Sequence, residues 1–272
     1  MESRNPVIRR YADFQKPGSV LGNNQGTVIT STPVESSTKT FPGTTPAKPG
    51  ERVVTMDDVV MKSFGMFALL LAGAFVGWNA PGLAIMAAIA GLVLGLVNTF
   101  KKNVSPVLVL AYALIQGIFV GGISYIYQNA FVADGTNIVG NTIMCTMVAF
   151  GTMLFLFKTG IIKVDAKFTR MMMVAMVSYL VIAVISIVAS FMGVGGGWGF
   201  YGVGGLGILL ALFGVGLASF SLMLDFQSIR QAISMGLPER ESWRLAFGLT
   251  VTLVWLYLEM LRLFAILAGR RE

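Results

Sequence analysis

Long hydrophobic runs alternate with short polar segments from residue 58 onwards, and this pattern predicts the architecture of the chain. Each of seven runs holds about 20 mostly apolar residues, the length that an α-helix needs to cross the hydrocarbon core of a bilayer. No run shows the alternation of a membrane β-barrel, so helices satisfy the backbone hydrogen bonds in lipid. We expect an all-α integral membrane protein with a seven-transmembrane-helix bundle, its helices at Val59–Trp78, Gly82–Phe100, Pro106–Tyr127, Ile138–Phe157, Met171–Met192, Val203–Ser228 and Leu245–Ala268.

Small residues recur at a spacing of four in three of these expected helices. Such pairs allow two helix backbones to approach closely in lipid, so we interpret them as packing positions. The pairs are Gly73/Gly77, Gly91/Gly95 and Gly117/Gly121.

The segment before the first expected helix has a different composition. It is rich in Pro, Ser, Thr and Asn, for example between Thr30 and Gly50, and it contains no hydrophobic core of a signal peptide. A segment of this kind buries too little apolar surface to fold alone. We therefore expect a disordered cytoplasmic tail over residues 1–55 and a transmembrane domain over residues 56–272.

The basic residues, which give the chain a net charge of +7, are distributed unevenly. Lys and Arg occur in the tail and in the second, fourth and sixth connections between the expected helices, while the three alternate connections contain none. Cytoplasmic loops of membrane proteins carry this excess of positive charge. We expect the N-terminus in the cytoplasm, and the net charge indicates topology rather than a nucleic-acid partner.

The chain contains no histidine. This excludes Ser–His hydrolysis, imidazole-ligated zinc and histidine-ligated haem. We expect no cofactor and no enzymatic activity.

Two carboxylates interrupt the last two hydrophobic runs. Asp225 lies in the sixth expected helix and Glu259 in the seventh. A charge in hydrocarbon costs several kcal/mol, so intramembrane acids usually face a protein interior or water and have a function there. These two residues are the candidate functional site.

Three motifs carry a resemblance to a known family. "LMLDFQSI" (Leu222–Ile229), "LYLEMLRLF" (Leu256–Phe264) and "SPVLVLAYALIQGIFVGGISYIY" (Ser105–Tyr127) resemble helices of the transmembrane Bax inhibitor motif family, in a bacterial form. The resemblance implies a seven-helix bundle with the last helix central, in the bacterial plasma (inner) membrane. It also implies a pH-sensitive calcium leak in which paired acids sense protons, and by motif position these are Asp225 and Glu259.

The chain departs from this family pattern at two points. Its second acid is Glu259 where the family commonly has Asp, and Thr99 stands where an arginine can pair with the acids. Lys101 and Lys102 are the nearest basic residues. An ion pair between one of them and the acids, a possible latch between helices, would be weaker, because lysine lacks the bidentate fork of arginine. Arg262 is a further candidate, since it lies three residues after Glu259 on the same helix and the two could neutralise each other.

Physical chemistry supports a proton-sharing pair as one hypothesis. Two adjacent buried carboxylates titrate as a unit, and when ionised they are hard ligands suited to Ca²⁺. Asp225 and Glu259 would then form both the pH sensor and the cation site. Their binding partners would be protons and calcium ions. Two alternatives stay open: a regulatory membrane protein that acts through a protein partner, such as a membrane protease or a stress pathway, and an intramembrane aspartyl protease.

Overall fold

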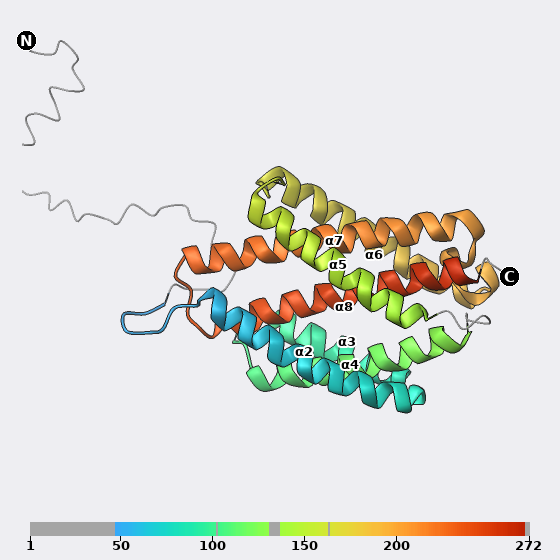
Figure 1. Cartoon of the computed structure of the whole chain (residues 1–272), viewed down its shortest axis with the longest axis horizontal. Helices are drawn as coiled ribbons and strands as arrows, with labels where there is room; N and C mark the ends of the chain where they lie inside the picture. Colours follow the sequence, from blue (N-terminus) through green and yellow to red (C-terminus); the bar gives the residue numbers. More distant parts are fainter. Residues whose placement is uncertain (1–46, 102, 131–136, 163, 270–272) are drawn as a thin grey trace, which may run out of the picture. The chain divides into compact units, whose positions relative to one another are not determined.

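The structure is a computed structural model that describes residues 47–101, 103–130, 137–162 and 164–269. Lys102 and residues 1–46 of the predicted tail lie outside the described residues. Helices form nearly all of the described part, and Figure 1 labels them. They are α2 (Met56–Asn79), η1 (Pro81–Leu83), α3 (Ala84–Phe100), α4 (Pro106–Ala130), α5 (Ile138–Thr159), α6 (Ala166–Phe191), η2 (Val194–Gly197), η3 (Gly199–Gly202), α7 (Gly204–Ser234) and α8 (Glu241–Ala268).

The prediction of seven transmembrane helices is confirmed for the described residues. Seven helices there, α2 to α8, have the length and apolar composition of membrane spans, with η1 extending the second. The two helices that carry the acids are longer than the sequence predicts. α7 continues to Ser234, and α8 begins at Glu241 instead of Leu245.

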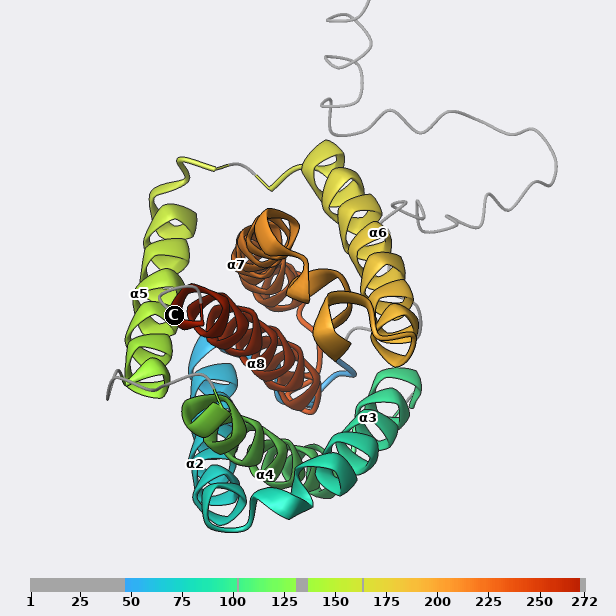
Figure 2. The same ribbon diagram turned by 90° about the vertical axis from the view of Figure 1, so that its right-hand side faces the viewer.

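α7 and α8 lie side by side inside a ring formed by α2, α3, α4, α5 and α6, as the view along the helices in Figure 2 shows. α8 packs against α7, α2, α5 and α4. A helix inside such a ring can carry polar side chains without exposing them to lipid. Both acids therefore lie on the enclosed helices.

α2 and α4 form the closest helix pair, through the glycines that the four-residue spacing singled out. A Cβ atom on Gly117 would overlap the backbone carbonyl of Leu70, and one on Gly77 would overlap that of Ile118. The absence of side chains at these positions therefore sets the distance between the two backbones.

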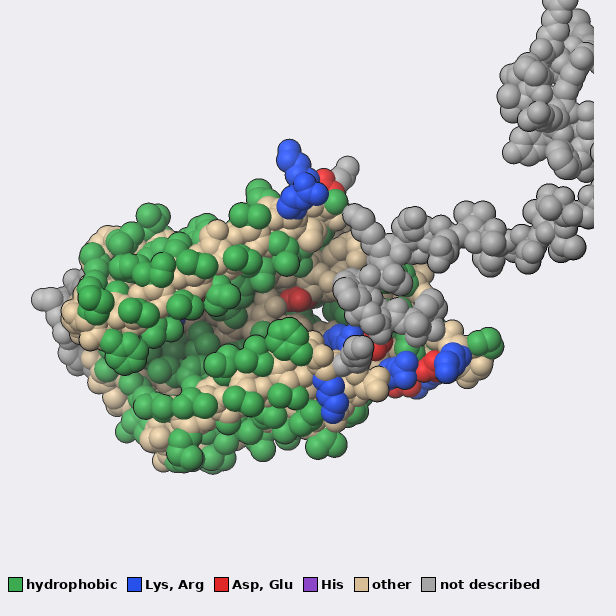
Figure 3. Space-filling model, turned by 180° about the vertical axis from the view of Figure 1, so that it is seen from behind, with side chains coloured by type: hydrophobic (Ala, Val, Ile, Leu, Met, Phe, Trp, Pro, Cys, Tyr) green, Lys and Arg blue, Asp and Glu red, His purple; other side chains and the backbone are tan. Residues whose placement is uncertain are grey.

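The two ends of the bundle differ in chemistry. α2, α4, α6 and α8 begin at the end that we call the basic end, where Lys62, Lys101, Lys158, Arg230 and Arg244 lie. Charged side chains gather toward this end in Figure 3, and hydrophobic side chains cover most of the remaining surface. The opposite end, the aromatic end, contains the edge-to-face ring pairs Trp78–Tyr125 and Tyr127–Trp198.

A short extended segment before α2 closes the basic end. The Val54 N–H donates to the Leu237 carbonyl, and the Glu239 N–H donates to the Arg52 carbonyl. Lys62 of α2 also forms an ion pair with Glu239, with its Nζ 3.0 Å from Oε1. The segment 47–54 and the start of α2 therefore hold the turn between α7 and α8.

Candidate functional site

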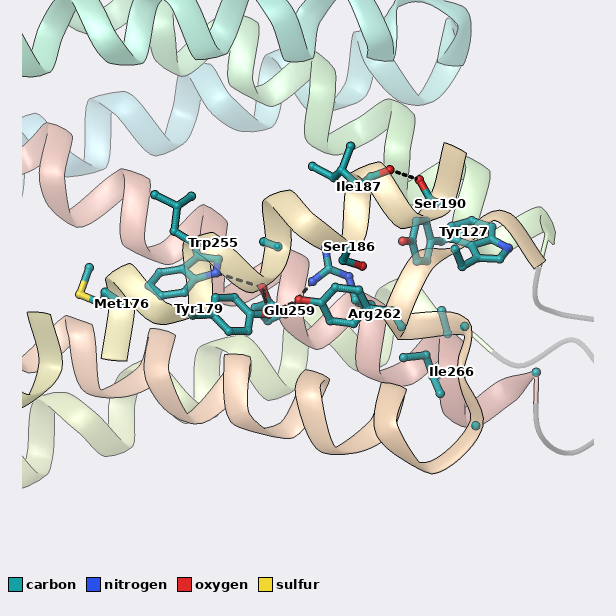
Figure 4. Close-up of a pocket in the computed structure, with 18 of the residues that line it drawn as sticks. Tyr127, Met176, Tyr179, Ser186, Ile187, Ser190, Trp255, Glu259, Arg262 and Ile266 are labelled. Atoms are coloured by element: carbon teal, nitrogen blue, oxygen red, sulfur yellow. Dashed lines mark hydrogen bonds and ion pairs between the residues drawn. The ribbon is translucent and has the colours of Figure 1, made fainter. Parts of the chain in front are cut away.

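Glu259 is enclosed in the half of the bundle nearer the aromatic end, with 3% of its surface exposed. Its Oε1 accepts hydrogen bonds from Tyr179 Oη at 2.8 Å and from Trp255 Nε1 at 3.0 Å. Its Oε2 accepts one from Arg262 Nη1 at 2.9 Å, and Figure 4 shows these side chains together. The buried carboxylate thus has three donors, one of which is a cation.

Helix geometry explains why these residues converge. Trp255, Glu259 and Arg262 follow one another at spacings of four and three, so they share one face of α8. Tyr179 reaches them from α6, and α7 makes room with Gly214. A Cβ atom on Gly214 would lie 2.5 Å from Tyr179 Oη and 2.7 Å from Glu259 Oε2. The Tyr179–Glu259 bond therefore depends on glycine at position 214.

Arg262 and two tyrosines extend this network toward the aromatic end. The guanidinium carbon of Arg262 lies 4.2 Å from the centre of the Tyr201 ring, an arrangement that stabilises the cation. Tyr201 Oη donates to Tyr179 Oη at 2.8 Å. Burial raises the pKa of the Tyr201 hydroxyl, which keeps it a donor. Tyr201, Tyr179 and Glu259 thus form a continuous chain of hydrogen bonds.

A cleft of about 820 Å³ lies beside this network, between α6 and α8. Most of its wall is apolar, and Glu259 and Arg262 are the only charged side chains among the described residues that line it. Its volume falls in the range of small-molecule sites.

Asp225 occupies a different cavity. It lies on α7, and Thr252 of α8 lines the same cavity beside it. The Asp225 Oδ2 is buried and has no hydrogen-bond partner among the described residues. A buried carboxylate oxygen without a partner is costly, so its environment has a role that packing does not explain.

The cavity next to Asp225 has a volume of about 730 Å³ and lies between α3, α4, α7 and α8. Besides Asp225, oxygen-bearing side chains line it from three helices: Asn98 and Thr99 on α3, Tyr112 and Gln116 on α4, and Thr252 on α8. These groups can accept hydrogen bonds or bind a hard cation.

The structure does not bring Asp225 and Glu259 together. Asp225 lies nine residues before the end of α7, and Glu259 lies eighteen residues after the start of α8. At 1.5 Å per residue these positions are about 13 Å and 27 Å from the basic end, so the acids are offset by about 13 Å along the bundle. The predicted proton-sharing pair therefore does not form, and Glu259 pairs with Arg262 instead.

The predicted lysine latch has no counterpart at either acid in the part of the chain that the structure describes. Lys101 is exposed at the end of α3, and its backbone carbonyl accepts a hydrogen bond from Arg244 Nη2 at 3.3 Å. Lys102 lies outside the described residues. Among the described residues, no three Cys, Asp or Glu side chains form a cluster that could hold a metal ion. A cation at Asp225 would therefore need neutral oxygens and water to complete its shell.

Several residues of the two sites are not apparent from sequence patterns. Tyr179 and Thr252 come from expected spans in which a single hydroxyl residue carries no signal. The spacing of Trp255, Glu259 and Arg262 on one helix face is a signal that the sequence does contain.

The chain matches a known protein family. A family model described as "Bax inhibitor 1 like" matches residues 5–269, nearly the whole chain. No curated protein gives a significant match. Together with the seven apolar helices, the family match shows an integral membrane protein in contact with the lipid bilayer.

Proposed function

Because the chain belongs to the Bax inhibitor 1 like family, we propose that it is a pH-sensitive calcium (cation) leak, with Asp225 as the site where protons and cations compete. The observation that carries this proposal is the buried Asp225 Oδ2 without a hydrogen-bond partner among the described residues. The proposal places the protein in a bacterial plasma membrane with the basic end in the cytoplasm, and it assigns no enzymatic activity.

The oxygens around Asp225 suit a hard cation in transit, and Arg244, at the basic end, is the one cationic side chain among the described residues that line this cavity. An ionised Asp225 supplies one negative charge, and the carbonyl or hydroxyl oxygens of Asn98, Gln116 and Thr252 are ligands of the type that Ca²⁺ accepts. One acid with neutral oxygens binds Ca²⁺ weakly compared with a site of several carboxylates. Weak binding favours a pathway, because an ion that conducts must also leave.

Protonation of Asp225 removes the charge that attracts the cation. A protonated carboxyl group also gains one O–H donor while it keeps acceptor capacity on its other oxygen, so the hydrogen bonding of Asp225 in the cavity changes. Because Asp225 on α7 and Thr252 on α8 line the same cavity, this change acts between the two enclosed helices. pH would thus control both the occupancy of the cavity and the packing around it.

Glu259 has a separate task in this proposal. Its bonds to Tyr179 and Arg262 join α6 to α8 at the level where a pathway from the Asp225 cavity would continue toward the aromatic end. With this network intact the pathway is closed, so conduction requires the network to open.

The test measures calcium flux in liposomes that contain the purified protein and a calcium-sensitive dye, across a series of pH values. The wild-type chain is expected to give pH-dependent flux, and Asp225→Asn is expected to abolish the pH dependence. The control is Asp57→Asn, because Asp57 is an exposed carboxylate at the start of α2.

Two results would contradict the proposal. If Asp225→Asn leaves both the flux and its pH dependence unchanged, Asp225 is not the sensor. If the wild-type protein gives no flux above empty liposomes at any pH, a regulatory role through a protein partner becomes the better interpretation.

A further inference from the structure

The cleft beside Glu259 and Arg262 runs along the inner face of α6. Met176, Leu180, Ala183 and Ile187 line it at spacings of four, three and four, which is one face of that helix. α6 packs on α7, η2 and η3, and the cleft separates this face from α8. An apolar helix face inside the membrane region therefore lacks a helical neighbour along the cleft.

The dimensions of the cleft match one leaflet of a bilayer. It extends along α6 from Met173 to Ser190, near the aromatic end, and Figure 4 shows Met176 and Ser190 toward opposite ends of the cleft. Seventeen residues at 1.5 Å per residue span about 26 Å, slightly more than half of the roughly 40–45 Å thickness of a membrane with its head groups. An apolar space of this length in a membrane suits an acyl chain better than water.

The polar part of the cleft presents a cation. The Glu259 carboxylate is 3% exposed and is covered by Tyr179 and Trp255. The Arg262 side chain is 30% exposed, and its hydrogen bond to Glu259, within the described part of the chain, comes from Nη1 alone. A guanidinium has five N–H donors, so Arg262 retains donors for an acceptor that lies in the cleft. Its planar fork suits phosphate or carboxylate oxygens.

We propose that this cleft binds one anionic amphiphile from the leaflet at the aromatic end. Its phosphate or carboxylate head lies on Arg262, near Tyr201, and its acyl chain extends along Leu180 and Ala183 toward Met176. The two sources of this chemistry are a phospholipid and a free fatty acid. The cleft is separate from the Asp225 cavity, although it contains the Glu259–Arg262 pair to which the proposed function gives a gating role, and the test of lipid binding does not depend on ion transport.

The experiment is native mass spectrometry of the full chain released from detergent micelles, with one added probe at a time. The probes are dioleoyl phosphatidylglycerol, oleate and the neutral dioleoylglycerol. The wild-type chain is expected to bind one molecule of an anionic probe, and to bind the neutral probe at least about tenfold more weakly, the ratio that corresponds to 1.4 kcal/mol. The tighter of the two anionic probes identifies the source.

Two variants distinguish the cleft from lipid that coats the outside of the bundle. Ala183→Phe places a ring in the cleft, and the adjacent Val184→Phe places the same ring on the exposed face of α6. Ala183→Phe is expected to weaken binding of the anionic probe by about tenfold or more. Val184→Phe is expected to leave it unchanged. Equal binding by both variants would overturn the proposal.

A third variant tests the head group without leaving a buried charge alone. Glu259→Gln with Arg262→Gln removes both charges of the pair; Gln has the size of Glu, and at position 262 it shortens the side chain. The preference for the anionic over the neutral probe is expected to disappear in this variant. A preference that persists would show that Arg262 does not bind the head group, which would refute the assignment.

Discussion

The separation of the two acids makes a quantitative prediction about their energetic independence. Residues that are more than about 10 Å apart and share no partner have additive effects on stability, to within roughly 0.5 kcal/mol. Asp225 contacts Thr252, whereas Glu259 contacts Tyr179, Trp255 and Arg262. The double variant Asp225→Asn/Glu259→Gln should therefore change the free energy of unfolding by the sum of the changes in the two single variants.

The two single variants should differ strongly in their free energy of unfolding. Glu259→Gln leaves Arg262 without its counter-ion, and breaking a buried ion pair costs about 3–5 kcal/mol. We expect the lower end, about 3 kcal/mol, because the Arg262 side chain is 30% exposed. Asp225→Asn removes a carboxylate that has no ion pair in the described part of the chain, so the free energy of unfolding should stay the same or increase.

The assay is reversible unfolding by sodium dodecyl sulfate in mixed micelles, followed by tryptophan fluorescence, since Trp255 contacts Glu259 directly. A second cycle with Glu259→Gln and Arg262→Gln serves as the positive control, with an expected coupling energy of about 1.5–3 kcal/mol for a charged hydrogen bond. A coupling above about 1 kcal/mol between Asp225 and Glu259 would refute the separation of the two sites.

Three further substitutions test the packing of the bundle, two on α7 and one at the basic end. Gly214→Ala should destabilise the protein by about 1–3 kcal/mol, because its Cβ displaces Tyr179 and Glu259. Gly216→Ala, two residues further along α7 with no atom within 4 Å of the new Cβ, should instead stabilise it by up to about 1 kcal/mol in the same unfolding assay. Lys62→Met should accelerate hydrogen–deuterium exchange in the α7–α8 turn, residues 235–240, because Lys62 holds Glu239; unchanged exchange would contradict this role.

The helices could be predicted from the sequence because their signal is local. A run of about 20 apolar residues is decided by composition, and each predicted run contains the larger part of one helix. The close approach of α2 and α4 was also predictable, since Gly73, Gly77, Gly117 and Gly121 follow a simple spacing. Composition does not predict which helices share the interior, because neighbouring hydrophobic runs look alike, and the central position of the last helix was expected only from the family resemblance.

The partners that the acids have on other helices, Thr252 for Asp225 and Tyr179 for Glu259, could not be predicted, because they depend on register between helices. The polar residues Glu241 and Ser242 suggest a loop, yet both are buried in the first turn of α8. This early start places Glu259 deeper than a helix from Leu245 would. The alternative pairing with Arg262 needed only the three-residue spacing within one helix, which the sequence contains. The contribution of Tyr179 depends on the packing of α6, for which the sequence has no signal.

α7 provides a physical link between the two sites. It carries Asp225 in one cavity and Gly214 against Glu259 beside the other, eleven residues and about 16 Å apart on one rigid element. A change at Asp225 that shifts α7 along its axis must therefore also change the space at Gly214 that holds the Tyr179–Glu259 bond. Two distant sites can be energetically coupled when one rigid helix contacts both and has two packed arrangements. In the proposed leak, a proton taken up at Asp225 would bias the Glu259 network through α7 by less than about 1 kcal/mol, the coupling that the double variant allows, without any direct contact between the acids.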